Sequence, residues 1–169
     1  MVGFGACSCD RLRVITGPAR RAVVWTRAAR QPAYLYYWTY VPDGPNGGSA
    51  HHACEQPFVF HVKEESPAEA AEDSEHYHFN AKNPFEMDLS TQLVQMYANM
   101  ADQGSPGTSW PVYNMGEKMT MIFGDDRPTH AGPTYTLSNH RGEKCDFWDR
   151  QFDRVMADYT TTRNPGGGR

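Results

Sequence analysis

Two adjacent histidines, His51 and His52, lie at the end of a Gly-rich loop, and Glu55 follows three residues later. Imidazole is the side chain most often used as a general base near neutral pH. The loop begins where the strongly apolar run 33–40 ends, and α/β sheets place their chemistry at the carboxyl ends of strands. The order of strand, loop and histidine predicts a general base. Glu55 could bond the backbone near His52 as in a capping box, or it could only cap the turn.

A metal site is the alternative use of the histidines. His76 and His78 follow an acidic segment, and with His51 and His52 they could ligate zinc. A His-x-His pair can chelate a metal on a strand, but no third ligand lies at a spacing typical of a metal site. A solvent-exposed loop is therefore the favoured interpretation of His76 and His78.

The element that must position the histidines is the run 33–40. Its side chains alternate, with Leu35, Tyr37 and Thr39 on one face and bulky aromatic residues on the other. Both faces are mostly apolar, which predicts a strand covered on both sides, as in an α/β sheet. Further strands are predicted at 119–124 and 134–137.

Three helices are predicted around this sheet, at 17–31, 87–103 and 145–159. Pro18 fits the first turn of the first helix, whose arginines, among them Arg20 and Arg21, should form a solvated face. Asp88 or Ser90 is the expected N-cap of the second helix, which ends near Gly104. The third helix should pack on the sheet edge through one apolar face. That face comprises Trp148, Phe152, Val155 and Met156.

The bulk properties indicate one globular domain. The chain has 169 residues, a net charge of −4 and a pI near 5.9, so it lacks the basic field typical of nucleic-acid-binding proteins. No apolar run approaches the length of a membrane span. Segment 1–16 is predicted to be irregular, segment 62–86 an acidic flexible loop and segment 160–169 a flexible tail.

Several motifs, in order along the chain, resemble the C-terminal portion of the type-B carboxylesterases, the α/β-hydrolase family that includes the cholinesterases. The central match is Tyr34-Leu-Tyr-Tyr-Trp38 followed by Gly48-x-x-x-His52-x-x-Glu55-x-Pro-Phe-Val-Phe60, which is similar to the family's catalytic-histidine region. The others are Gly17-Pro-Ala-Arg-Arg21, Leu89-Ser90, Met96-Tyr-Ala-Asn-Met-Ala101 (Tyr-Trp-Ala-Asn-Phe-Ala in the family), Gly104-Ser-Pro106, Trp110-Pro-Val-Tyr113 and Cys145-Asp-Phe-Trp148. The resemblance covers the segment from about residue 10 to residue 152.

The resemblance implies a function in carboxylic-ester hydrolysis, with His52 as the catalytic base, Glu55 in support, and neither metal nor cofactor. It also shows what is missing from the chain. The G-x-S-x-G nucleophile elbow, the acid and the Gly-rich oxyanion motif of a serine esterase are not in this sequence. In cholinesterase-like relatives the cysteine aligned with Cys145 pairs with a cysteine where this chain has Gly17, so Cys145 is expected to be a free thiol.

We therefore interpret the sequence as a C-terminal fragment of a serine carboxylic-ester hydrolase with an incomplete α/β sheet, inactive alone, whose partner is the upstream half of the hydrolase domain. The alternative is a non-catalytic binding protein like the cholinesterase-like adhesion molecules. The retained His52 and Glu55 speak against that alternative, because a binding module needs no base. An uncovered edge at strand 33–40 is expected to favour self-association.

Overall fold

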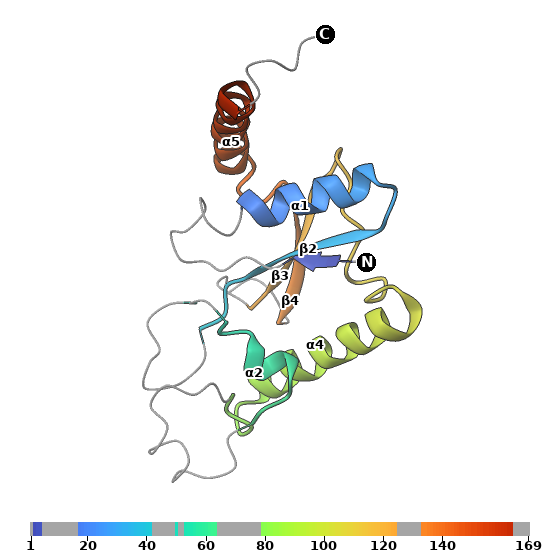
Figure 1. Cartoon of the computed structure of the whole chain (residues 1–169). Helices are drawn as coiled ribbons and strands as arrows, with labels where there is room; N and C mark the ends of the chain where they lie inside the picture. The colour runs from blue at the N-terminus through green and yellow to red at the C-terminus, as the bar shows by residue number, and fades with distance from the viewer. Residues whose placement is uncertain are drawn as a thin grey trace.

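The computed structural model describes residues 2–4, 17–41, 50, 53–63, 79–124 and 133–163 (Figure 1). Four strands form one sheet in the order β1-β2-β3-β4, in which β1, β2 and β3 are parallel and β4 is antiparallel to β3. The strands are β1 (Val2–Phe4), β2 (Ala33–Trp38), β3 (Met119–Phe123) and β4 (Thr134–Ser138).

Helices lie on both sides of the sheet. α1 (Gly17–Ala28) and α5 (Gly142–Arg163) lie on one side, and α2 (Gln56–Val59) and α4 (Pro84–Gln103) lie on the other (Figure 1). This arrangement confirms the predicted α/β class, with sheet strands flanked by helices.

Strand β2 is the centre of the molecule. All six of its residues are buried, and its side chains alternate between two cores. Tyr34, Tyr36 and Trp38 pack in the core shared with α4, whereas Ala33 and Leu35 pack in the core shared with α1. The prediction of a strand covered on both faces is confirmed.

The prediction that this strand has an uncovered edge is wrong, because β2 pairs with β1 on one side and with β3 on the other. Its pairing partner β1 lies inside segment 1–16, for which the sequence predicted no regular structure. A strand of three residues is too short to show a period of two, so neighbouring strands rather than local pattern define it. Within the described residues, β1 and β4 are the outer strands of the sheet.

Helix α4 begins earlier than predicted. Its N-cap is Asn83, whose side-chain Oδ1 accepts a hydrogen bond from the backbone N–H of Phe85, and Pro84 occupies the first turn. The expected caps Asp88 and Ser90 therefore lie inside the helix, and the predicted acidic loop gives way to helix at residue 84. Proline is well suited to a first helical turn, where its missing N–H is not needed. Residues 64–78 of that loop lie outside the described residues.

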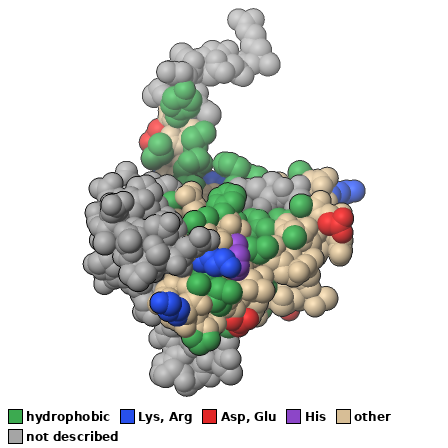
Figure 2. Space-filling view, turned by 90° about the horizontal axis from the view of Figure 1, so that it is seen from below, with side chains coloured by type: hydrophobic (Ala, Val, Ile, Leu, Met, Phe, Trp, Pro, Cys, Tyr) green, Lys and Arg blue, Asp and Glu red, His purple; other side chains and the backbone are tan. Residues whose placement is uncertain are grey.

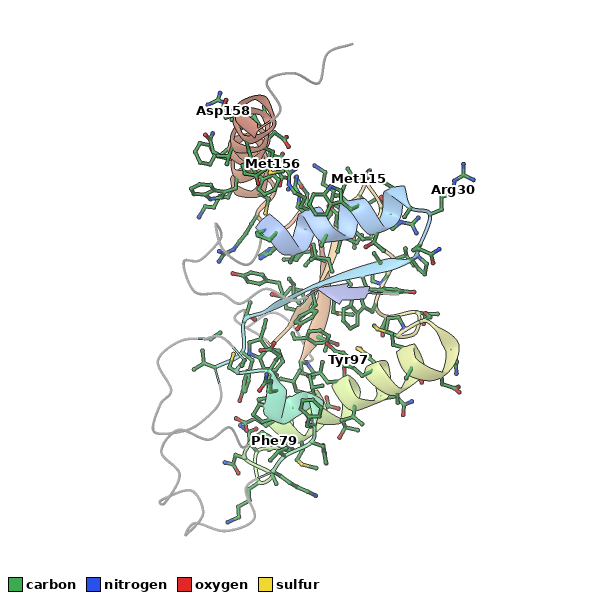
Figure 3. All side chains as sticks on the ribbon, in the orientation of Figure 1. Arg30, Phe79, Tyr97, Met115, Met156 and Asp158 are labelled. Carbon is green, nitrogen blue, oxygen red and sulfur yellow. The ribbon has the colours of Figure 1, made fainter. Side chains whose placement is uncertain are left out.

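Helix α5 does not pack on the sheet edge as predicted. Its early residue Cys145 is buried, but three members of the predicted packing face, Phe152, Val155 and Met156, are exposed, with 65% of Val155 accessible. The helix contacts α1 and projects away from the sheet (Figures 1 and 3). The apolar pattern predicts a helix, but it does not determine which surface packs against the apolar residues.

Two arginines of α1 hold α5 in place. Arg20 donates a hydrogen bond to Asp146 and lies 3.0 Å from Asp149. Arg21 lies 2.8 Å from Asp153 and 3.6 Å from Asp149. The side chains of Arg20 and Arg21 are only 11% and 17% exposed, so the predicted solvated face is wrong for these two residues. We call these five residues the α1–α5 ion pairs.

We predict that Asp149→Asn, which removes the carboxylate shared by both arginines, lowers the free energy of unfolding by about 1 kcal/mol at low salt. Urea unfolding followed by circular dichroism measures this change, and 1 M NaCl should shrink it because salt screens partly exposed charges. Asp102→Asn, on the exposed end of α4, is the matched control. An equal loss in both variants would contradict a specific role of the ion pairs.

The same ion pairs should give a defined dependence on pH. The hydrogen bond from Arg20 lowers the pKa of Asp146 below its ordinary value. Its contribution to stability is therefore full above the unfolded-state pKa, near 4, and is lost as the pH falls through the lower folded-state value. Between pH 5 and 8 the contribution of Asp146 should stay constant.

Candidate active site

The predicted base His52 and its neighbour His51 lie outside the described residues, as do His76 and His78. The residues on either side of the histidine loop are described. At its start, the backbone N–H of Thr39 donates to the carbonyl of Phe123, so the chain leaves the sheet at the carboxyl end of β2. Immediately before His51, Ala50 is buried in the same core as Trp38.

Glu55 is the N-cap residue of the short helix α2, yet its side chain makes no capping hydrogen bond. The Tyr36 hydroxyl, on β2, instead donates to Glu55 Oε1 at 3.4 Å. The other oxygen, Oε2, is buried and has no hydrogen-bond partner among the described residues. The carboxylate therefore faces the sheet rather than the end of α2, which differs from the suggested capping role. A bond from Glu55 to the backbone near His52 stays a prediction, because His52 lies outside the described residues.

Tyr97 of α4 completes this group. Its phenol is hydrogen-bonded to Tyr36, and burial, the main cause, raises its pKa above the ordinary value. Both tyrosines pack edge-to-face on Trp110, with ring centroids 5.8 Å away for Tyr36 and 6.4 Å away for Tyr97. Residues from β2, α4 and the start of α2 thus meet at Glu55. Figure 3, which labels Tyr97, shows it at the face of α4 turned toward the sheet.

A fully buried carboxylate was not predicted. Glu86 is completely buried and accepts hydrogen bonds from the Tyr40 hydroxyl at 2.8 Å and the backbone N–H of Asn80 at 2.5 Å. It ties the point where the chain leaves β2 to the first turn of α4. The sequence signal that could have placed Glu86 in a helix is Asn83-Pro84, because an N-cap asparagine followed by proline marks a helix start. Glu86 then belongs to the first turn of that helix and not to the predicted loop.

A Ser–His contact is present within the part of the chain that the structure describes, but its hydrogen bonds are those of a structural pair. His61 Nδ1 lies 2.7 Å from Ser90 Oγ, and Ser90 Oγ donates to the carbonyl of Phe58 at 2.8 Å. Because a hydroxyl has a single proton, His61 must donate to Ser90 and cannot accept its proton. Ser90 is also fully buried. This serine is therefore not a nucleophile, and it ties α2 to α4.

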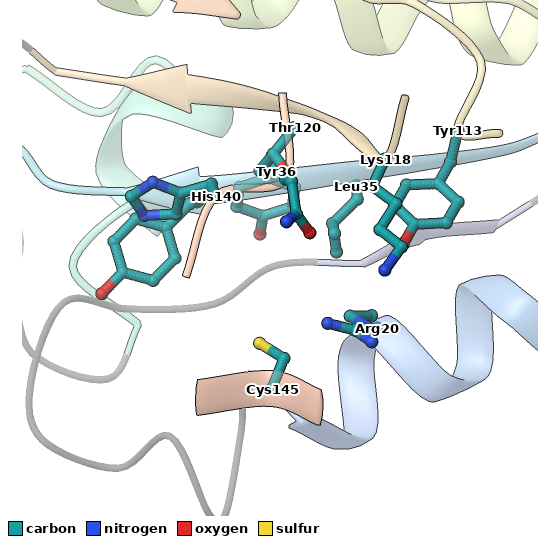
Figure 4. A pocket seen from close by; sticks show the side chains of 10 residues that line it. Arg20, Leu35, Tyr36, Tyr113, Lys118, Thr120, His140 and Cys145 are labelled. Carbon is teal, nitrogen blue, oxygen red and sulfur yellow. The ribbon is translucent and has the colours of Figure 1, made fainter. Parts of the chain in front are cut away.

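Cys145 lies in a small cavity on the other side of the sheet, lined also by Arg20, Tyr113 and Lys118 (Figure 4). The thiol is free, as predicted, and burial raises its pKa, which opposes formation of the nucleophilic thiolate. The cavity measures about 20 Å³, which is room for roughly one water molecule. It is too small for an ester substrate.

No set of three His, Cys, Asp or Glu side chains within the described ranges is arranged to hold a metal ion. Among these same residues, no helix is long and apolar enough to cross a membrane.

Comparisons with known proteins identify the fold. No family model matches the sequence, and no curated protein matches it. Solved structures do match, and several of them are esterases. A carboxylesterase of Geobacillus stearothermophilus aligns with a TM-score of 0.60 and 20% identity over 81% of this chain and 26% of its own. An esterase from Clostridium hathewayi, described as able to hydrolyze aliphatic aromatic polyesters, aligns with a TM-score of 0.57 and 19% identity over 81% of this chain and 25% of its own.

The chain thus spans about a quarter of the length of the solved esterases that it matches. A PNB esterase gives the same result, with 21% identity, a TM-score of 0.50 and coverage of 70% of this chain and 22% of the esterase. The resemblance of the motifs to the carboxylesterases is confirmed in the fold: the described chain has the architecture of one part of a carboxylesterase-type α/β-hydrolase.

Proposed function

We propose that this chain is the C-terminal fragment of a serine carboxylic-ester hydrolase and supplies its catalytic-histidine loop. One observation carries the proposal. The carboxyl end of the buried central strand β2 leads into the segment that contains His52, within a fold that matches about a quarter of the length of each solved esterase. In such sheets this edge is where catalytic side chains gather.

In the complete enzyme, His52 would accept the proton of the serine hydroxyl as that oxygen attacks the ester carbonyl. It would then give the proton to the leaving alcohol and activate the water that hydrolyses the acyl-enzyme. Glu55 supports the loop that holds His52. The serine, the acid and the oxyanion donors must come from the missing part of the hydrolase domain, so the chain alone is inactive.

The exposed apolar face of α2 and α4 supports the interpretation as a fragment. Phe60, directly after α2, is 73% exposed, and Val62 and Val94 are 41% and 38% exposed. Figure 2 views the molecule from the side of these helices and shows exposed apolar side chains among polar and charged ones. An apolar surface of this kind marks a protein contact, and the absent upstream part of the domain is the occupant that the coverage of the esterases suggests.

The second candidate is a non-catalytic binding protein with a cholinesterase-like fold. The same exposed apolar face would then be its binding surface. The observation that distinguishes the two is Glu55, a half-buried residue three positions after a histidine whose Oε2 is buried, because a binding surface has no use for it.

The test is co-expression with an upstream fragment of a carboxylesterase that carries the serine and the acid. We expect the chain alone to hydrolyse nitrophenyl acetate no faster than free imidazole, and the pair of fragments to show saturable turnover. Saturable turnover by the chain alone, lost in His52→Ala, would contradict the fragment interpretation. Stable association without turnover would favour the binding protein.

A further inference from the structure

The cavity beside Cys145 contains a buried hydroxyl group that no described residue satisfies. Tyr113 lies between α4 and β3 and is 1% exposed, and its hydroxyl oxygen has no hydrogen-bond partner among the described residues. Tyr113 lines the cavity together with Arg20 of α1 and Cys145 of α5, and Figure 4 shows these three side chains around the same space. Buried polar atoms nearly always have a partner, so the hydroxyl indicates that the cavity binds a polar ligand.

The charged side chains around the cavity are engaged with one another. Arg20 donates a hydrogen bond to Asp146 and lies 3.0 Å from Asp149. The ammonium group of Lys118 lies 3.9 Å from Asp146. Two cations therefore face two carboxylates, and burial raises the pKa of the Cys145 thiol, which keeps it neutral. Because these charges cancel, the cavity favours an uncharged ligand over an anion.

The size of the cavity limits what it can bind. Its volume of about 20 Å³ is room for roughly one water molecule. A buried water molecule makes about three hydrogen bonds, so it needs polar groups around it. The side chains of Thr120, on β3, and Asn139, directly after β4, line the cavity beside the Tyr113 hydroxyl. The walls therefore offer a water molecule both donors and acceptors.

We propose that this cavity is a binding site for one structural water molecule, which accepts a hydrogen bond from the Tyr113 hydroxyl. Tyr113 is itself fixed to β2, because its backbone N–H donates to the carbonyl of Ala33 at 2.8 Å. The water molecule therefore ties α5, at Cys145, to the sheet. This inference is independent of the proposed function, because α1 and α5 lie on the opposite side of the sheet from α2 and Glu55.

The first experiment counts long-lived water molecules in the purified full chain by ¹⁷O magnetic relaxation dispersion, which detects intact water and no exchanging hydroxyl protons. Cys145→Val adds one methyl group, which is about the size of a water molecule, and should lower the dispersion amplitude by one water. Tyr34→Phe is the matched control, since Tyr34 is equally buried but belongs to the core on the other side of the sheet. It should leave the amplitude unchanged.

The second experiment is urea unfolding of Tyr113→Phe in two backgrounds. In the wild type, we expect the unfolding equilibrium constant to rise about three- to tenfold, as for the loss of one hydrogen bond. In Cys145→Val, where the water molecule is displaced, the same change should leave the constant unchanged or lower it, because the hydroxyl then has no partner to lose.

An unchanged dispersion amplitude in Cys145→Val would overturn the inference, as would a Tyr113→Phe variant that is no less stable than the wild type. If Cys145→Val fails to fold by circular dichroism, Thr120→Ile, which fills the cavity from β3, replaces it. The amplitude should be the same in buffers with and without chloride. A water signal that chloride abolishes would show that an anion occupies the site, and would also overturn the inference.

Discussion

In the complemented hydrolase, His52→Ala should lower kcat for nitrophenyl acetate by a factor on the order of 10⁴ to 10⁶, whereas His51→Ala should change it by less than about tenfold. The members of a catalytic triad act as a unit, so removal of the base costs nearly as much as removal of the nucleophile. The two histidines are adjacent in the sequence, and only His52 has the spacing to Glu55 that the carboxylesterase motif requires.

The measurement is steady-state kinetics of both variants beside the wild type, with titration of the serine by an organophosphonate to count active sites. An equal loss of kcat in both histidine variants would mean that the loop tolerates no substitution. The kinetics would then contradict the assignment of His52 as the base. A large loss only in His51→Ala would move the base by one position and overturn the alignment on which the proposal rests.

The largest effect on stability is expected from Trp110→Ala, with a loss of about 3–5 kcal/mol in the free energy of unfolding. Trp110 is 1% exposed, contacts the rings of Tyr36 and Phe123, and donates its indole N–H to the carbonyl of Leu35 at 3.3 Å. It therefore links β2 to β3 and to the loop after α4. A loss of this size approaches the whole stability of a small domain.

Trp25→Ala is the matched control for this prediction. Trp25 has the same side chain but lies on α1 with 58% of its surface exposed. Its replacement should cost no more than about 0.5 kcal/mol, as for other exposed positions. Urea unfolding followed by far-UV circular dichroism compares the two. Similar midpoints for both variants would show that the core around Trp110 is not packed as described.

The sequence predicts the central strand and the helices well where one local pattern determines them. The run 33–40 has bulky residues on both faces, and only a strand between two layers can bury both. Gly104, which was expected to end the second helix, ends α4 with a φ of 76°. Patterns failed where a distant partner decides the structure, as with β1, which is defined by its pairing to β2, and α5, which is held by arginines of α1.

The contacts of the candidate site also depend on residues that are distant in the sequence, so local patterns could not predict them. Glu55 was singled out by its distance from His52, and no local signal indicated that its carboxylate faces Tyr36 on β2. The contact joins residues 19 positions apart, and Tyr97 is further still along the chain. Glu86 was missed because the start of α4 was placed too late. Prediction of these contacts requires the packing of α4 on the sheet, which no single segment encodes.

The position of β2 in the sequence also determines how long this strand lacks its partner β3 while the chain is being synthesised. Tyr36 pairs with Met121, so about 85 residues must be synthesised after β2 before its partner β3 exists. At a translation rate of about 5–20 residues per second, the aromatic strand waits roughly 4–17 s without that neighbour. During this interval Tyr36, Tyr37 and Trp38 have no β3 edge to join. We therefore expect ribosome-associated chaperones to bind the nascent chain strongly until Phe123 has left the exit tunnel.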